Sequence, residues 1–196
     1  MTNIIDSLRE DHANLAKLLD ALERQLGLFN EGETPDYDIV RGVVDYCLDY
    51  PDLYHHPKED LVLEHLKAAD PVAAAAIGDL AAEHQALAAL TRRFADAIDA
   101  ILQDIQVPRG PFADTARRFL EAYREHMNKE EQEFLPAARR ALGAADWAEI
   151  DARLSQPEDP LFGAPTEAHF AALRQNVLDW AQEARAQEAR LRSKHG

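Results

Sequence analysis

The sequence has little cysteine, few basic residues and no long apolar run. Cys47 is the only cysteine, which excludes disulfides within the chain and a metal cluster held by several thiolates. No uncharged apolar stretch approaches the roughly 20 residues that span a bilayer, so we expect no contact with a membrane. The 21 Lys and Arg residues face 36 Asp and Glu residues, for a net charge of −15. A surface of this sign repels the phosphates of nucleic acids.

The N-terminus lacks the features of a secretion signal. The segment MTNIIDSLREDH carries acidic residues where a signal peptide has basic ones, and it has no long apolar core. We therefore expect a soluble, cytoplasmic protein. Its 196 residues, 46% hydrophobic and 29% charged, suffice for about one globular domain with a real core.

The composition and the spacing of apolar residues both indicate helices. Valine, isoleucine and threonine are sparse, whereas alanine, leucine, glutamate and arginine are abundant, and this balance favours helix over strand. Apolar residues recur at helical spacing in four stretches, namely residues 8–27, 37–66, 77–105 and 112–134. Pro51 and Pro57 predict a kink or a break in the second stretch. The short connections favour antiparallel neighbours, so the sequence predicts an all-α, up-down-up-down four-helix bundle.

The bundle is predicted to occupy residues 1–142, and residues 143–196 to form a helical C-terminal extension. The extension begins with a helical piece from about Trp147 to Leu154 and a loop with the sequence SQPEDPLFGAP. A last helix is predicted from about Thr166 to Ser193.

Each of the four stretches contains a histidine where the pattern requires an apolar residue. These histidines are His12, His55, His84 and His126. Glu59 follows His55 and Glu130 follows His126 at a spacing of four, which places both members of each pair on one helix face. A single histidine on an apolar face is usually a core residue with its hydrogen bonds satisfied. Four histidines and two glutamates in one interior are costly to desolvate.

The stretches offer no lysine or arginine at neighbouring core positions to balance the two glutamates. A pair of divalent or trivalent metal ions would supply the missing charge, and imidazole with carboxylate suits iron or manganese. Four imidazoles and two bridging carboxylates give about four donors per ion, which leaves open positions for water, a bridging oxide or a small gas. The E-x-x-H pairs of ferritin-like centres and the H-E-x-x-H motif of metalloproteases are both absent.

The order H, H-x-x-x-E, H, H-x-x-x-E resembles the hemerythrin-like family of HHE cation-binding domains. The resembling segments are DHANL, YHHPKEDLVLEHL, AEHQAL and EHMNKEEQEFLP, which span most of the first 140 residues. The resemblance implies two iron ions, or manganese or zinc in their place, bridged by oxide, hydroxide or water. It makes His12, His55, His84 and His126 terminal ligands, and Glu59 and Glu130 bridging ligands.

The sequence departs from the oxygen-carrying hemerythrins, which place two histidines one turn apart on the third helix. Leu80 and Ala88 occupy the positions one turn either side of His84, so one ion lacks a ligand, which argues against simple reversible oxygen carriage. The missing donor is left open between water, His56 and Glu83. On a regular helix His56 would point about 100° away from His55, and we expect it to be a partly exposed residue at a helix start.

The remaining candidates are expected to be structural. Tyr123 is expected to pack its ring in the core, with a hydrogen bond to a metal-bound oxygen species as the alternative. Glu131 is expected on a solvated face. His65, His169 and His195 have no partners on the apolar stripes and are expected at the surface.

The predicted function is a non-haem di-iron protein that binds or senses a small oxidant or diatomic, such as oxygen, nitric oxide or peroxide. Two alternatives remain, an oxidase- or peroxidase-type enzyme and a protein that stores or donates iron. The sequence does not decide whether the protein is an enzyme, and it identifies no protein or redox partner.

Overall fold

The regular structure of the described residues is entirely helical, which confirms the all-α prediction for this part of the chain. The computed structural model describes residues 4–154, 159–162, 170–171 and 173–179. The helices are α1 (Ile4–Glu31), α2 (Tyr37–Tyr50), α3 (His56–Ala69), α4 (Pro71–Ile77), α5 (Leu80–Leu102), α6 (Arg109–Lys129), α7 (Leu135–Ala141) and α8 (Ala144–Arg153). Two π-helical turns, η1 (Pro51–His55) and η2 (Glu130–Phe134), interrupt this series.

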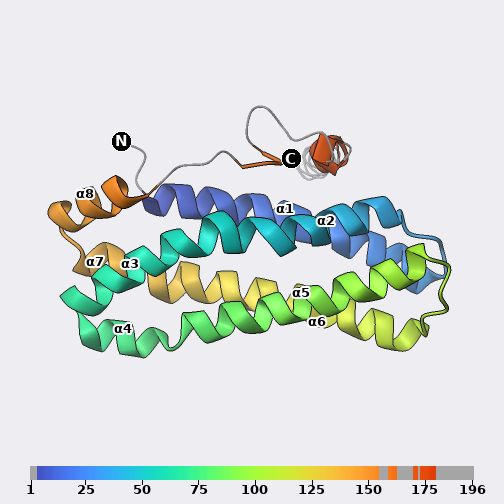
Figure 1. The fold of residues 1–196 in the computed structure, drawn as a ribbon, viewed down its shortest axis with the longest axis horizontal. Coiled ribbons are helices and arrows are strands. Elements are labelled where there is room, and N and C mark those ends of the chain that lie inside the picture. The colour runs from blue at the N-terminus through green and yellow to red at the C-terminus, as the bar shows by residue number, and fades with distance from the viewer. Residues whose placement is uncertain (1–3, 155–158, 163–169, 172, 180–196) are drawn as a thin grey trace, which may run out of the picture.

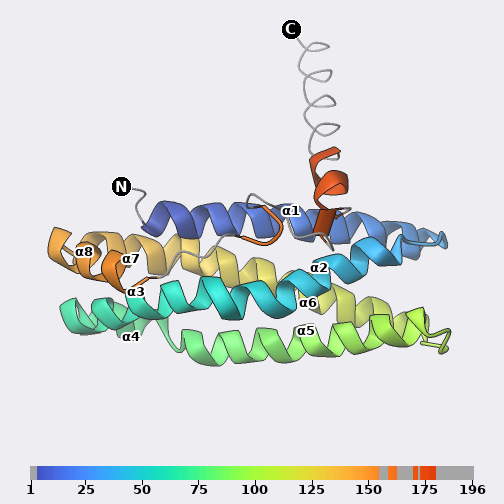
Figure 2. The same cartoon turned by 45° about the horizontal axis from the view of Figure 1, so that its top comes forward.

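The helices line up into long rods that lie side by side (Figures 1 and 2). The first rod is α1 and the third is α5. The second rod is α2, η1 and α3, and the fourth is α6, η2 and α7, because the backbone stays helical through both π-helical turns. Helix α1 packs against α2 and α6, and α5 packs against the same two helices. Each rod therefore has two neighbours around a shared interior.

The two π-helical turns have the same local cause. Pro57 and Pro136 each lie two residues beyond the end of a π-helical turn. A proline ring clashes with the carbonyl four residues earlier and has no N–H to donate to it. In the wider turns the His56 N–H reaches the Pro51 carbonyl and the Leu135 N–H reaches the Glu130 carbonyl. This geometry moves the carbonyl four residues before each proline away from the proline ring. The kink predicted in the second stretch is therefore a π-helical turn.

The predicted bounds of the third helix, residues 77 and 105, are wrong at both ends. Ile77 ends the short helix α4, Gly78 follows with φ +87°, and the Asp79 side chain caps α5 by accepting the Ala82 N–H. A positive φ is a conformation that glycine adopts without steric cost, so the chain breaks there. Helix α5 ends at Leu102 rather than at residue 105. The first helix is longer than predicted, since α1 continues to Glu31.

A polar layer divides the interior into two apolar clusters. One cluster contains Phe94 and Phe119, and the other contains Phe134 and Leu135. Along α1 the change from one cluster to the other falls between Leu8 and Leu15, around His12. The other rods change cluster at the same level, between Tyr50 and Val62, between Leu80 and Leu87, and between Met127 and Phe134. All four rods thus bring polar side chains to one level of the interior.

Part of the C-terminal extension packs on α2. Asp159 accepts a hydrogen bond from the Tyr46 hydroxyl at 2.9 Å, and a Cβ on Gly42 would lie 3.2 Å from Leu173 Cδ2. Residues 173–179 are helical, whereas most of the predicted helix from Thr166 to Ser193 lies outside the described residues. The boundary between residues 142 and 143 stays a prediction. Within the described ranges, no helix is both long and apolar enough to cross a membrane.

Core packing around Phe94 gives a direct test of this arrangement. The Phe94 side chain is fully buried, so we expect Phe94→Ala to lower the free energy of unfolding by about 3–5 kcal/mol. Val72 is 81% exposed, and Val72→Ala should change it by less than about 0.5 kcal/mol. Equilibrium denaturation of both variants in the same metal state measures the difference. Equal effects would contradict the described core.

Candidate metal centre

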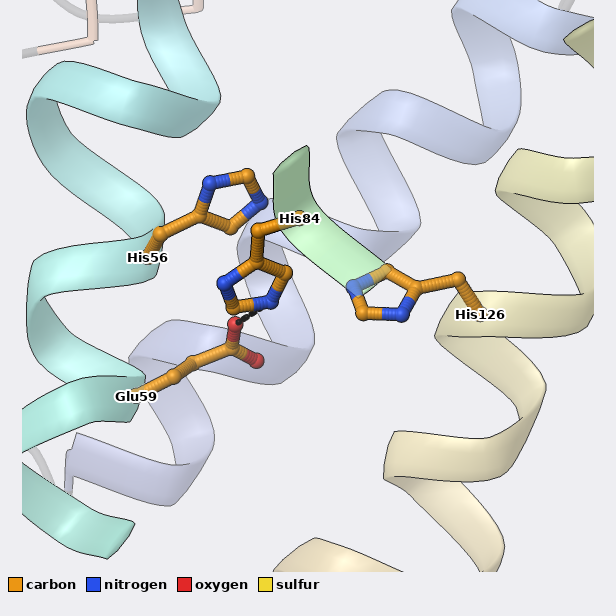
Figure 3. A group of neighbouring side chains, drawn as sticks. All are labelled: His56, Glu59, His84 and His126. Carbon is orange, nitrogen blue, oxygen red and sulfur yellow. Dashed lines mark ion pairs between the residues drawn. The ribbon is translucent and has the colours of Figure 1, made fainter. Parts of the chain in front are cut away.

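The structure brings all six predicted side chains together in the polar layer, and each is buried. They come from every rod: His12 from α1, His55 and Glu59 from the second rod, His84 from α5, and His126 and Glu130 from the fourth rod. Figure 3 shows Glu59, His84 and His126 pointing toward one another, with His56 beside them. The helical spacing thus led to side chains that meet in space.

Two overlapping groups of potential ligand atoms lie in this layer. The two-histidine group consists of His12, His55, Glu59 and Glu130, and the three-histidine group consists of His56, Glu59, His84 and His126. Within each group, one ligand-type atom per residue lies within 4.8 Å of all the others. This spacing suits atoms arranged around a single ion, and Glu59 belongs to both groups.

Glu130 also faces both groups. One carboxylate oxygen, Oε2, lies 3.2 Å from His12 Nε2, and the other, Oε1, lies 3.0 Å from His126 Nε2. Glu59 is arranged similarly, with Oε1 3.3 Å from His55 Nε2 and Oε2 3.4 Å from His84 Nε2. Each carboxylate therefore directs one oxygen toward each group, which is how a bridging ligand is arranged.

Six buried polar atoms of this layer have no hydrogen-bond partner among the residues that the structure describes. They are both carboxylate oxygens of Glu59, both of Glu130, and Nε2 of His84 and of His126. Buried polar groups without partners are rare and costly. Among the described residues, only histidines lie within ion-pair distance of the two glutamates. The donor set fits metal cations, because a cation would satisfy the carboxylates and the imidazole nitrogens together.

Four of the five histidines place their other ring nitrogen, Nδ1, next to an outer carboxylate. The pairs are His12 with Glu131 at 3.0 Å, His55 with Asp11 at 3.1 Å, His56 with Asp52 at 2.9 Å and His126 with Glu83 at 3.2 Å. A carboxylate that accepts the Nδ1 proton leaves Nε2 deprotonated and free for a metal. The imidazoles are therefore oriented as metal-binding histidines are.

His56 corrects the expectation of a partly exposed residue. It is buried, and its ring stacks on that of His84 with centroids 3.7 Å apart and an interplanar angle of 8°. The expectation assumed a regular helix, whereas the π-helical turn that ends at His55 turns the following residue inward. Glu83, the other side chain left open for this position, accepts from His126 and forms an ion pair with Lys129.

Two of the outer carboxylates, Asp11 and Glu131, have positions that the sequence does not predict. Glu131 was expected on a solvated face, but it is partly buried and contacts His12. Asp11 was not singled out, although it directly precedes His12 in the sequence and that adjacency was the available signal. Both positions follow from helix geometry. A residue next to an inward-facing ligand on a helix lies at the edge of the bundle interior. Asp11 and Glu131 can thus reach the histidine of a neighbouring rod.

The other structural expectations have mixed outcomes. The Tyr123 hydroxyl lies 3.0 Å from Thr91 Oγ1 and donates to the Cys47 carbonyl at 3.3 Å, so it hydrogen-bonds within the core. The surface prediction for His65 is wrong in part, since the side chain is only 11% exposed and Nδ1 lies 3.6 Å from Asp146. His169 and His195 lie outside the described residues.

Each group borders a wide groove, and the two-histidine group also borders a small cavity. A groove of about 620 Å³ runs outside α5 and α6, with Glu83, His126 and Lys129 among its lining residues. A second groove, of about 480 Å³, has His12 and Glu131 among its lining residues. On the side of the two-histidine group lies a cavity of about 10 Å³, lined by Asp11, His12, Leu15, Tyr46, Tyr50, Pro51 and His55.

Without metal, protons on histidine would balance the two carboxylates. Burial alone would lower the pKa of His55, but the neighbouring carboxylates of Glu59 and Asp11 raise that pKa to about 10. Burial also opposes a charge on His84, but the neighbouring carboxylates of Glu130 and Glu59 raise the pKa of His84 to about 9. Burial and the charges of His84 and His55 lower the pKa of His56 to about 4. Protons and metal ions therefore compete for this layer.

This competition predicts how the stability of metal-free protein depends on pH. The ordinary histidine pKa is about 6.5, so stabilisation by the protons on His55 and His84 is fully present below that pH. It is lost as the pH rises through about 9 and about 10. We expect the Tm of metal-free protein to fall over this range, and that of zinc-loaded protein to fall less. Parallel declines in thermal unfolding with and without zinc would contradict the competition.

Comparison with known proteins gives one match. A family model described as the hemerythrin HHE cation-binding domain matches residues 3–138, which is more than half of the chain and includes every residue of both groups. No curated protein and no solved structure matches the chain.

Proposed function

The chain belongs to the hemerythrin HHE cation-binding domain family, and from this premise we propose that it holds two iron ions and binds or senses a small oxidant or diatomic. The observation that carries the proposal is the set of six buried carboxylate and imidazole atoms that converge without hydrogen bonds. An iron pair bridged by oxide, hydroxide or water supplies redox chemistry and an exchangeable coordination position. Oxygen, nitric oxide and peroxide are the ligand class that suits such a position.

We assign seven residues to the ion pair. Glu59 and Glu130 would bridge the ions, His12 and His55 would bind one ion, and His84 and His126 would bind the other. His56 is the seventh ligand, in place of the water or Glu83 that the sequence also left open. Its ring lies against His84 in the three-histidine group, and it supplies the imidazole that α5 lacks.

This assignment makes the two ions unequal. With both carboxylates and one bridging oxygen, the ion at the three-histidine group would have about six donors and the other ion about five. The position left for a small ligand would then lie at the two-histidine group. With His56 as a ligand, the three-histidine group lacks no donor, so the absence of a second histidine on α5 does not exclude oxygen carriage.

The small cavity supports a ligand of a few atoms. Its volume of about 10 Å³ is close to the space that a single water molecule requires. His12 and His55 line it together with the apolar residues Leu15 and Pro51. These walls favour a compact molecule of low charge over an organic substrate.

We also propose that the four rods form the up-down-up-down bundle of the family over residues 1–142, with residues 143–196 as an extension. The packing of α1 and α5 each against both α2 and α6 supports this topology. The cytoplasmic location stays a prediction.

Glu130 tests the bridging assignment. Glu130→Gln keeps the size of the side chain and removes its charge, so we expect the variant to lose most of its iron. It should also lose the gain in Tm that iron gives, because bound metal stabilises only the folded state. The matched control is Glu133→Gln, an exposed residue of the same segment, which should retain wild-type iron. Wild-type iron content in Glu130→Gln would overturn the assignment.

His56 tests the inequality of the two ions. We expect His56→Ala to bind iron more weakly at the three-histidine group and to have a changed optical spectrum, because the ion there loses an imidazole while the two-histidine group is intact. His65→Ala removes a histidine of α3 outside both groups and should retain both ions. Metal analysis and the optical spectrum of each variant measure the outcome. Full iron content with an unchanged spectrum in His56→Ala would show that His56 is not a ligand.

A further inference from the structure

Asp11 links the two-histidine group to a buried tyrosine. Its Oδ2 atom accepts from His55 Nδ1 at 3.1 Å and from Lys58 Nζ at 2.8 Å. Its Oδ1 atom accepts the Tyr50 hydroxyl at 2.9 Å. One carboxylate therefore connects a histidine of the proposed iron site with a phenol, and its two oxygens have separate partners.

Tyr50 is the middle member of a tyrosine stack made of Tyr46, Tyr50 and Tyr54. The Tyr46 and Tyr50 rings are nearly parallel, with centroids 4.8 Å apart and an interplanar angle of 18°, and both residues are buried. The Tyr54 ring lies 5.5 Å from that of Tyr50 and is only half-buried. Their spacing of four residues places all three on one face of the second rod. The stack thus runs from the centre of the molecule toward its surface.

The surroundings of these phenols suit loss of an electron together with a proton. Burial raises the pKa of Tyr46 and of Tyr50 far above the usual value, so both phenols keep their protons. A neutral phenol that loses an electron must release its proton, and it needs an acceptor in hydrogen-bond contact. Tyr50 donates to Asp11 and Tyr46 donates to Asp159. Asp11 also lines the small cavity, together with both tyrosines.

We propose that Tyr50 donates single electrons to the iron pair, and that the tyrosine stack passes the oxidising equivalent to the surface, so that the protein reduces peroxide with electrons from a small external donor. This inference rests on the proposed function, because it requires iron at the two-histidine group. It deepens that function by assigning a reaction and an electron path.

The reaction balances with peroxide as the oxidant and an ascorbate-type molecule as the reductant. Hydrogen peroxide takes up two electrons and two protons, its O–O bond breaks, and two waters leave. Each electron comes from Tyr50, whose O–H bond breaks as the proton moves to Asp11 Oδ1 and from there to a departing water. The oxidising equivalent passes to Tyr54 when Tyr54 gives one electron and its hydroxyl proton to the Tyr50 radical, which becomes the phenol again. The Tyr54 radical returns to the phenol by taking one hydrogen atom from the reductant. Two donor molecules are each oxidised by one electron per peroxide.

Tyr123 provides a matched control within the same chain. It is as deeply buried as Tyr50, but its hydroxyl contacts Thr91 Oγ1 and the Cys47 carbonyl. Neither partner is a carboxylate. Tyr50 and Tyr123 are thus similar in burial and differ in whether the hydroxyl has a carboxylate partner.

The experiment compares iron-loaded wild type, Tyr50→Phe and Tyr123→Phe. Each is mixed with hydrogen peroxide, frozen and examined by electron paramagnetic resonance, and ring-deuterated tyrosine identifies the signal. We expect a tyrosyl radical in wild type and in Tyr123→Phe, and its loss in Tyr50→Phe at unchanged iron content. Peroxide-dependent oxidation of ascorbate should be lost with it. Zinc-loaded wild type should give no radical, because zinc has no redox chemistry.

A second variant keeps the test decisive if Tyr50→Phe loses iron. Tyr54→Phe changes a half-buried side chain that belongs to neither group, and it should leave radical formation intact while lengthening the life of the radical in ascorbate. An unchanged lifetime in that case overturns the electron path. An equal radical yield in Tyr50→Phe, or no tyrosyl radical in iron-loaded wild type that consumes peroxide, overturns this inference and leaves the proposed function standing. A chain that binds no iron overturns both.

Discussion

The arrangement of the bundle depends on two buried carboxylates, Glu59 and Glu130, which have no lysine or arginine beside them in the described part of the chain. Burial of such charges requires a positive charge nearby, and among the described residues only imidazoles lie within ion-pair distance of them. Protonated histidines or metal ions satisfy that requirement, and the two states exclude each other at the same nitrogens. The apolar clusters on either side keep water away, so water cannot solvate the carboxylates in place of a positive charge.

The π-helical turns explain how two ordinary helical rods supply so many inward-facing donors. A regular helix presents a given face once in every 3.6 residues, so adjacent residues cannot share it. The turn that ends at His55 allows His55 and His56 to enter different groups of the same layer. The second turn begins with Glu130 and Glu131. Glu130 points into the interior, and Glu131 contacts and orients His12. Wide turns of this kind often accompany functional sites.

Much of this arrangement could be predicted from the sequence, because helical spacing reports which residues face inward. The convergence of His12, His84 and His126 followed from that spacing alone. The inward position of His56 did not, since a π-helical turn breaks the period on which the prediction relied. Asp11 was missed because the spacing of apolar residues identifies inward-facing positions and does not identify the functional residues beside them. The break at Gly78 was overlooked although glycine followed by a capping aspartate, Asp79, marked it.

The small cavity beside the two-histidine group has a consequence for the species that can occupy it. A hydrated cation carries a water shell that is too large for a space of about 10 Å³, whereas a single small neutral molecule can lie there against Leu15 and Pro51. Cations that load the centre would therefore enter through the wide grooves beside His126 and His12. Size alone then keeps this cavity for small neutral species.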